Sequence, residues 1–120
     1  MKGFVDDNQR ALIEVHVGAE PDSIKSMVTA WVDTAFNGGL VLPRGEVERL
    51  ELKEYSSTSA ILADGQHVEL PTYTCYLEWF GKEYRTQVVA NEGSHPLLGT
   101  MLLEGRDLVI SYRRKTVELN

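Results

Sequence analysis

Short apolar stretches, closely spaced and separated by turn-forming residues, constrain the fold of this chain more than any other feature. Residues 12–17 read Leu-Ile-Glu-Val-His-Val, an alternation of apolar and polar side chains that is typical of a half-buried strand. The Gly, Pro, Asp and Ser residues of 18–23 then end this strand. Many short strands at this spacing predict an all-β domain, either a barrel or a sandwich.

The same pattern gives the expected elements. We expect strands at 12–17, from 27 or 28 to 32, at 40–42, within 51–63, and at 67–70, 73–80, 84–89 and 107–112. A short helix is expected over 43–50, where Pro43 is tolerated in the first turn, and a helical turn over 100–104. The strands should be joined by a two-residue hairpin turn within 63–66 and by another turn at Gly81-Lys82.

Size and charge limit the function classes. The chain has 120 residues, 42% of them hydrophobic, which fits a single domain over 1–120. Its 12 basic and 18 acidic residues give a net charge of −6, which argues against nucleic-acid binding. We read Arg113-Arg114-Lys115 as a solvated strand end. No apolar run approaches the roughly 18 residues of a membrane span, and the start of the sequence lacks a signal-peptide pattern, so we expect a cytoplasmic protein without membrane contact.

The metal-ligating residue types are sparse. Cys75 is the only cysteine and lies in an apolar alternation, which predicts a buried structural thiol. His67-Val68-Glu69 matches half of a zinc deaminase signature, but the second half is missing, and His67 is expected at the surface of a hairpin. The remaining histidines, His16 and His95, have no ligand spacing, so no metal is expected.

One acidic residue stands in an unusual place. In the stretch AWVDTAFNGGLVLP, residues 30–43, Asp33 lies between an apolar strand and a turn of small residues. A carboxylate there is costly to bury unless it is hydrogen-bonded, paired or protonated. One interpretation is that Asp33 caps the turn by accepting backbone N–H groups, with help from Thr34.

A second interpretation uses the wider pattern. Val32-Asp33-Thr34-Ala35 is followed by a Gly turn and Leu-Val-Leu-Pro, and much later by the apolar-apolar-Gly segment of Pro96 to Leu103. This combination resembles the retropepsin-like (clan AA) aspartic proteases, most closely in order and spacing the small single-domain proteases of bacteria and archaea. The resemblance covers roughly residues 3 to 118. It implies a retropepsin-like closed β-barrel with one or two short helices.

The resemblance also implies an activity and a site. Asp33 stands at the catalytic position of an aspartic-type endopeptidase, and since only one such motif occurs, a homodimer has to supply the second Asp33. Thr34, Ala35, Leu98 and Gly99 would support the loop. The hairpin tip, Ala63, Asp64, Gly65 and Gln66, stands where the family places a flap over the substrate. The partner would be a peptide or protein substrate, and no cofactor is needed.

Two other functions stay open. Ala35 stands where the family usually carries glycine, so the chain is alternatively a retropepsin-like dimer that binds peptides or proteins with little or no catalysis. It is otherwise an unrelated all-β structural domain in which Asp33 is only a turn cap.

Overall fold

Strands make up most of the protein and join into one twisted sheet. The computed structural model describes residues 1–23, 26–61 and 63–120. Within these residues the strands are β1 (Lys2–Val5), β2 (Ala11–Gly18), β3 (Ser26–Val32), β4 (Leu40–Pro43), β5 (Lys53–Ile61), β6 (His67–Trp79), β7 (Lys82–Asn91), β8 (Leu97–Leu98), β9 (Leu108–Ser111) and β10 (Thr116–Leu119). A short helix, α1 (Arg44–Arg49), and a 3-10 helix, η1 (Thr100–Leu103), complete the described elements.

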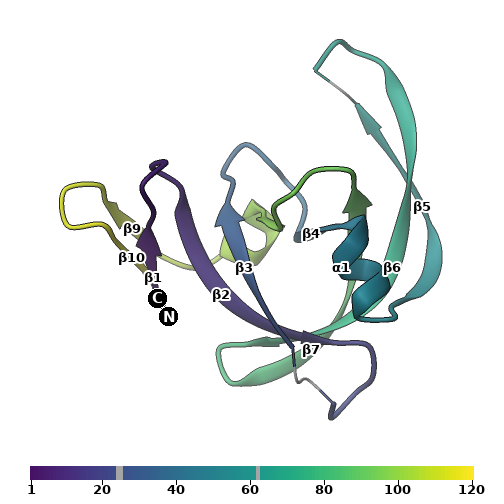
Figure 1. The fold of residues 1–120 in the computed structure, drawn as a ribbon, viewed down its shortest axis with the longest axis horizontal. Helices are drawn as coiled ribbons and strands as arrows, with labels where there is room; N and C mark the ends of the chain where they lie inside the picture. The colour runs from purple at the N-terminus through teal and green to yellow at the C-terminus, as the bar shows by residue number, and fades with distance from the viewer. Residues whose placement is uncertain (24–25, 62) are drawn as a thin grey trace.

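The middle of this sheet closes on itself. Its strand order is β5-β6-β7-β4-β8-β3-β2-β1-β10-β9, and β2 also pairs with β6. That additional pairing, which includes His16 opposite Glu78, turns β2, β3, β8, β4, β7 and β6 into a closed barrel. The expected all-β closed barrel with short helices is therefore confirmed (Figure 1).

The barrel core follows from the alternation seen in the sequence. In β2, Ile13, Val15 and Val17 are buried, whereas Glu14 and His16 between them are exposed. Inward side chains from the other barrel strands meet them, and Val47 of α1 covers one side. Burying such aliphatic side chains stabilises the fold by about 1.5–3 kcal/mol each.

The two ends of the described chain form strands that the sequence pattern did not predict. β1 pairs with β10 in antiparallel register, with Gly3 opposite Val117, and β1 also pairs with β2. Figure 1 shows the two termini side by side and the β9–β10 hairpin extending from the barrel next to them. Arg113, Arg114 and Lys115 lie at the exposed turn of this hairpin, as expected for solvated cations.

The prediction that residues 67–80 form two separate strands was wrong. β6 runs without interruption through Pro71, which pairs with Ser57 of β5. Pairing of β6 with β7 extends only from Thr72 to Trp79, so Pro71 lies beyond the part of β6 that is paired on both sides. A proline, which lacks an N–H donor, is tolerated at such a position.

The helices and hairpins begin and end close to their expected places. α1 starts directly after Pro43, and η1 is a 3-10 turn at 100–103. The turn after β6 is Phe80-Gly81 rather than Gly81-Lys82, since Trp79 pairs with Lys82 and both turn residues have positive φ. The turn expected at 63–66 lies at the tip of the β5–β6 hairpin, beyond the pair Ile61 and His67; residue 62 lies outside the described residues. No helix among the described residues is long and apolar enough to cross a membrane.

Candidate active site

The loop that carries Asp33 is held between three strands. It connects β3 to β4, and the short strand β8 lies between them, parallel to β3 and antiparallel to β4. Leu98 of β8 is opposite Val32 on one side and Leu40 on the other. Leu98 is fully buried and its carbonyl accepts the N–H of Asp33 at 2.9 Å. The apolar-apolar-Gly segment thus fixes both ends of the Asp33 loop.

The two oxygens of the Asp33 carboxylate have different surroundings. Oδ1 accepts the backbone N–H of Ala35 at 3.0 Å, and the carbonyl of Asp33 accepts the N–H of Phe36 at 3.2 Å. These bonds form the turn cap expected from the residue types. Oδ2 accepts no hydrogen bond from the described residues. One oxygen therefore orients the carboxylate and the other remains available to a ligand or a second subunit.

Ala35 fits the loop without backbone strain. It is exposed and is not among the residues with positive φ, so its methyl group does not require a conformation reserved for glycine. Thr34 next to it is also exposed, and its hydroxyl makes no hydrogen bond to the described part of the chain. The expectation that Thr34 helps to cap this turn is therefore not met within one chain.

Gly99 brings the segment after β8 into close contact with the same loop. Its N–H donates to the carbonyl of Gly39 at 2.7 Å, and the next amide, of Thr100, donates to the carbonyl of Phe36 at 2.8 Å. Gly99 is buried, with no room for a side chain. The loop is thereby held over its whole length by backbone hydrogen bonds.

Two cavities meet at this loop. The smaller, of about 400 Å³, is lined by residues 31–35 and Leu97 and contains Asp33. The larger, of about 800 Å³, also includes Leu97 but is lined by the second half of the loop, the β5–β6 hairpin and β7, and not by Asp33. We call this larger cavity the main groove. The Asp33 carboxylate thus lies beside the main groove rather than inside it.

Comparisons with known proteins bear on this geometry. Neither the protein-family profiles nor the curated proteins yield a match. Among solved structures the chain is similar to EIAV protease complexed with the inhibitor HBY-793, with a TM-score of 0.66 and 19% sequence identity, over 88% of this chain and 97% of that one. The chain has a retropepsin-like fold. At 19% identity this similarity supports the fold alone. The chemistry has to be argued from the residues of this chain.

The retropepsin-like barrel carries the hairpin tip at a distance from its body. Figure 1 shows β5 and the start of β6 extending past the barrel on the side where the β3–β4 loop lies. The tip residues Ala63, Asp64, Gly65 and Gln66 are exposed, and Asp64 Oδ1 accepts the N–H of Gln66 at 2.9 Å. Asp64 thus caps its own turn. A flap role for these residues stays a prediction.

A polar cluster lies against Trp31, which is one of the residues that line the Asp33 cavity. Arg10 donates through Nε to Asp6 Oδ2 and through Nη1 to His95 Nε2, both at 2.7 Å. The Trp31 ring packs edge-on against His95 with 6.1 Å between ring centres, and Trp31 lines the cavity with Asp33. The backbone N–H of Arg10, followed by its side chain, lowers the pKa of the Asp6 carboxyl. Asp6 is therefore paired with Arg10 and is not a free surface carboxylate.

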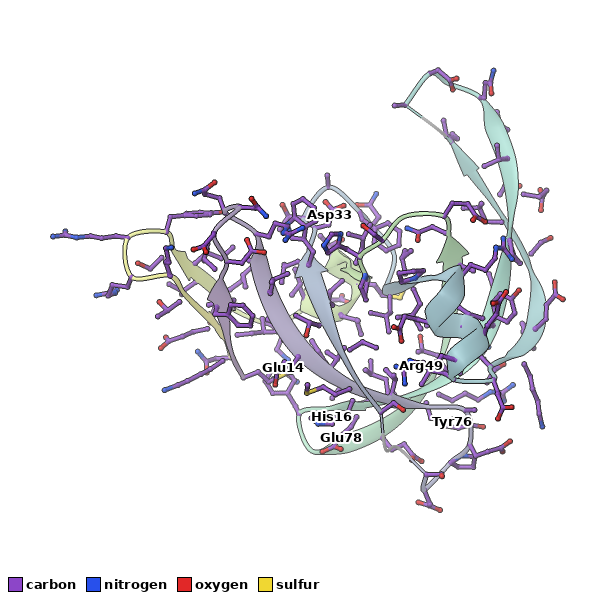
Figure 2. All side chains as sticks on the ribbon, in the orientation of Figure 1. Glu14, His16, Asp33, Arg49, Tyr76 and Glu78 are labelled. Carbon is purple, nitrogen blue, oxygen red and sulfur yellow. The ribbon has the colours of Figure 1, made fainter. Side chains whose placement is uncertain are left out.

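Several titratable side chains of the barrel strands lie away from Asp33. Figure 2 shows Asp33 at one end of the barrel and Glu14, His16 and Glu78 at the opposite end. Among the described residues, no three His, Cys, Asp or Glu side chains are grouped so that they could hold a metal ion. His67 is exposed on β6, as expected.

Cys75 lies in the core and not in the candidate site. It is fully buried, and burial raises the pKa of its thiol to about 11. The expectation of a buried structural thiol is confirmed.

The residues of the main groove could not be recognised from the sequence. Tyr55, Arg85, Gln87 and Met101 come from three different elements, and they line one cavity only because the barrel brings those elements together. The one local signal was the alternation along β7, which puts every second residue on the same face.

Proposed function

We propose that the chain is an aspartic-type endopeptidase that acts as a homodimer, with one Asp33 carboxylate from each subunit. The supporting observation is the asymmetric environment of this carboxylate: Oδ1 is held by the Ala35 N–H, while Oδ2 has no partner among the described residues. One carboxylate oxygen is held in place and the other is available to a ligand, and β8 pairs with the strands on both sides of the loop. A carboxylate that is oriented in this way is suited to catalysis.

The chemistry requires two such carboxylates that share one proton. The ionised member takes a proton from the attacking water, while the protonated member donates a hydrogen bond to the carbonyl of the scissile peptide. Two carboxylates that lie side by side do not both ionise readily, because their negative charges repel. The pair therefore keeps one shared proton in acidic solution. The N–H of Ala35 orients each carboxylate for this exchange.

The surface around Asp33 supports the homodimer. Thr34 and Ala35 are exposed, and Trp31 is 39% exposed despite its size. The hydroxyl of Thr34 is available to brace the loop against its counterpart in a second subunit. A symmetric interface brings the same loop of both subunits to the two-fold axis, so a single Asp33 per chain suffices.

The proposal also includes the substrate, the flap and the surroundings of the protein. The substrate is an extended peptide, the hairpin tip at 63–66 covers it, and neither a metal nor a cofactor takes part. The likeness to small single-domain proteases of bacteria and archaea and a cytoplasmic location belong to the same proposal.

A peptide-binding dimer with little or no catalysis is the second candidate. It is favoured by the position of the main groove, because the described residues that line this cavity do not include Asp33. A peptide bound there needs no catalytic carboxylate.

Cleavage of a diverse peptide library between about pH 4 and 7 tests the first proposal, with wild type and Asp33→Asn compared and the oligomeric state measured for both. We expect cleavage by the wild-type dimer and none by the variant dimer. Equal cleavage by both would overturn the role of Asp33. A well-formed dimer that binds peptides without cleaving them would favour the second candidate.

A further inference from the structure

The main groove is large enough to hold more than a single side chain. At about 800 Å³ it falls within the usual range of ligand sites. Apolar side chains from several elements line it, among them Phe36 of the Asp33 loop, Tyr55 and Leu70 of the β5–β6 hairpin, Leu97 of β8 and Met101 of η1. Such a lining accommodates a large apolar side chain of a ligand.

One strand supplies the polar wall of the groove. Arg85, Gln87, Val89 and Asn91 alternate along β7, and all of them line the cavity. Because side chains alternate between the two faces of a strand, these residues share one face. Arg85 is the only charged residue among the described residues of the lining.

Four arginines, Arg85, Arg106, Arg113 and Arg114, form no ion pair with the described residues, and Arg85 is the one of these that lines the main groove. Arg10 is paired with Asp6, Arg44 with Glu92 and Arg49 with Glu46. No acidic side chain among the described residues forms an ion pair with Arg85, although acidic residues outnumber basic ones in the chain. An unpaired guanidinium beside an apolar surface is suited to a carboxylate, which it can bind through two parallel hydrogen bonds.

On the same wall, Gln87 has a buried acceptor atom without a hydrogen-bond partner in the described structure. Its Nε2 donates to Thr74 Oγ1 at 3.3 Å, whereas its Oε1 is buried without a hydrogen-bond partner in the described structure. A buried acceptor without a donor costs about 1–3 kcal/mol. Because this oxygen has almost no exposed surface, a ligand donor reaches it only if the Gln87 side chain turns toward the groove.

We propose that the main groove selects peptides that carry one Asp or Glu side chain close to a large apolar side chain, with Arg85 binding the acidic group. This specificity rests on the proposed peptide substrate. The net charge of −6 disfavours strongly acidic peptides in general, so the preference is for a single, local carboxylate.

Matched peptides test the proposal. A set of capped octapeptides with a central Phe or Leu carries Glu, Gln or Lys at each flanking position in turn. Binding is measured on Asp33→Asn, so that cleavage does not interfere, and cleavage is measured on the wild type. We expect the Glu peptide at one or more positions to bind about 3- to 10-fold more tightly than its Gln counterpart, as for a partly exposed charge pair.

Arg85 variants assign that preference to the groove. In the Asp33→Asn background, Arg85→Gln should remove the difference between Glu and Gln peptides, and Arg85→Glu should favour the Lys peptide. Arg113→Gln is the matched control, because Arg113 lies exposed in the β9–β10 turn outside the groove, and the preference should persist there. Folding of each variant is checked by its unfolding transition.

The outcomes separate this inference from the proposed function. Suppose that cleavage is lost in Asp33→Asn, but that the wild type cleaves the Glu and Gln peptides equally well. This result would support the proposed protease and overturn the role of Arg85. An Arg85-dependent preference in binding without any cleavage by the wild type would support the groove and count against the protease. No binding and no cleavage by the folded protein would overturn both.

Discussion

Gly99 lies so close to Gly38 that a Cβ atom on Gly99 would stand 2.2 Å from the Gly38 carbonyl oxygen. The same atom would also lie 2.7 Å from the Phe36 carbonyl oxygen. Both oxygens accept backbone hydrogen bonds, Gly38 from Met101 and Phe36 from Thr100. The glycine is therefore required by the close approach of two backbones and not by its φ angle of −96°.

Replacing Gly99 by alanine should displace the Asp33 loop. The methyl group would meet backbone atoms, which have no rotamer to move away, and we expect a loss of about 2–4 kcal/mol in the free energy of unfolding, together with a loss of activity. Urea denaturation measures this loss. The control is Gly45→Ala in α1, where a Cβ meets nothing within 4 Å and stability should be unchanged or slightly higher. A Gly99→Ala protein as stable as wild type would contradict the close approach.

Asp33 should show two separable roles in stability and catalysis. Asp33→Ala removes the acceptor for the Ala35 N–H and should lower the free energy of unfolding by about 0.5–2 kcal/mol. Asp33→Asn retains a side-chain oxygen that can accept this N–H, so its stability should stay close to that of wild type. Both variants should lack cleavage. Thermal unfolding and peptide cleavage on the same preparations check this, and an inactive but fully stable Asp33→Ala would show that the turn cap is dispensable.

The parts of the fold that could be predicted from the sequence are those with a strong local pattern. The alternation of Leu12 to Val17 predicted β2 to within a residue at each end, and the Pro43 start of α1 was equally local. β1 and β10 were missed because each is only a short mixed stretch, whose strand conformation depends on pairing between opposite ends of the chain. Such non-local pairing leaves no periodic signal.

In the candidate site, too, some features could be predicted from the sequence and others could not. The spacing of Asp33 and the Leu97-Leu98-Gly99 segment resembles a known family, so both could be singled out. In the structure the segment does lie beside the Asp33 loop, because β8 pairs with β3 and the Leu98 carbonyl accepts the N–H of Asp33. That Ala35 adopts no positive φ depends on the loop conformation, which three strands determine jointly. Arg85 gave no signal because a lone arginine in an exposed strand is ordinary until a cavity is seen beside it.

His95 should stabilise the Arg10 side chain, which lies over the Trp31 ring. A guanidinium only donates, so His95 Nε2 accepts from Arg10 Nη1, and Nδ1 carries the proton towards Ser94 Oγ at 2.9 Å. His95→Phe keeps a ring against Trp31 but removes this acceptor, and we expect a loss of about 1 kcal/mol in the free energy of unfolding.

A double-mutant cycle separates the Arg10–His95 hydrogen bond from other effects of these changes. Urea unfolding of His95→Phe, Arg10→Gln and the double variant should give a coupling energy of about 0.5–1 kcal/mol. The control is Ser94→Ala, which removes only an exposed contact of the same imidazole and should cost less than about 0.5 kcal/mol. Strict additivity of the two single variants would show that the contact contributes nothing.

Cys75 should make stability depend on pH in the alkaline range. Burial raises the pKa of its thiol from the ordinary 9.0 to about 11, so between these values the unfolded chain releases a proton that the folded chain retains. The free energy of unfolding should therefore fall as the pH rises above 9, by about 2 kcal/mol relative to Cys75→Ala at pH 11. The two proteins differ only at position 75, so the difference between their urea unfolding curves at pH 8 and pH 11 isolates the thiol. Parallel losses in the two proteins would show that the Cys75 thiol ionises as easily in the fold as in the unfolded chain.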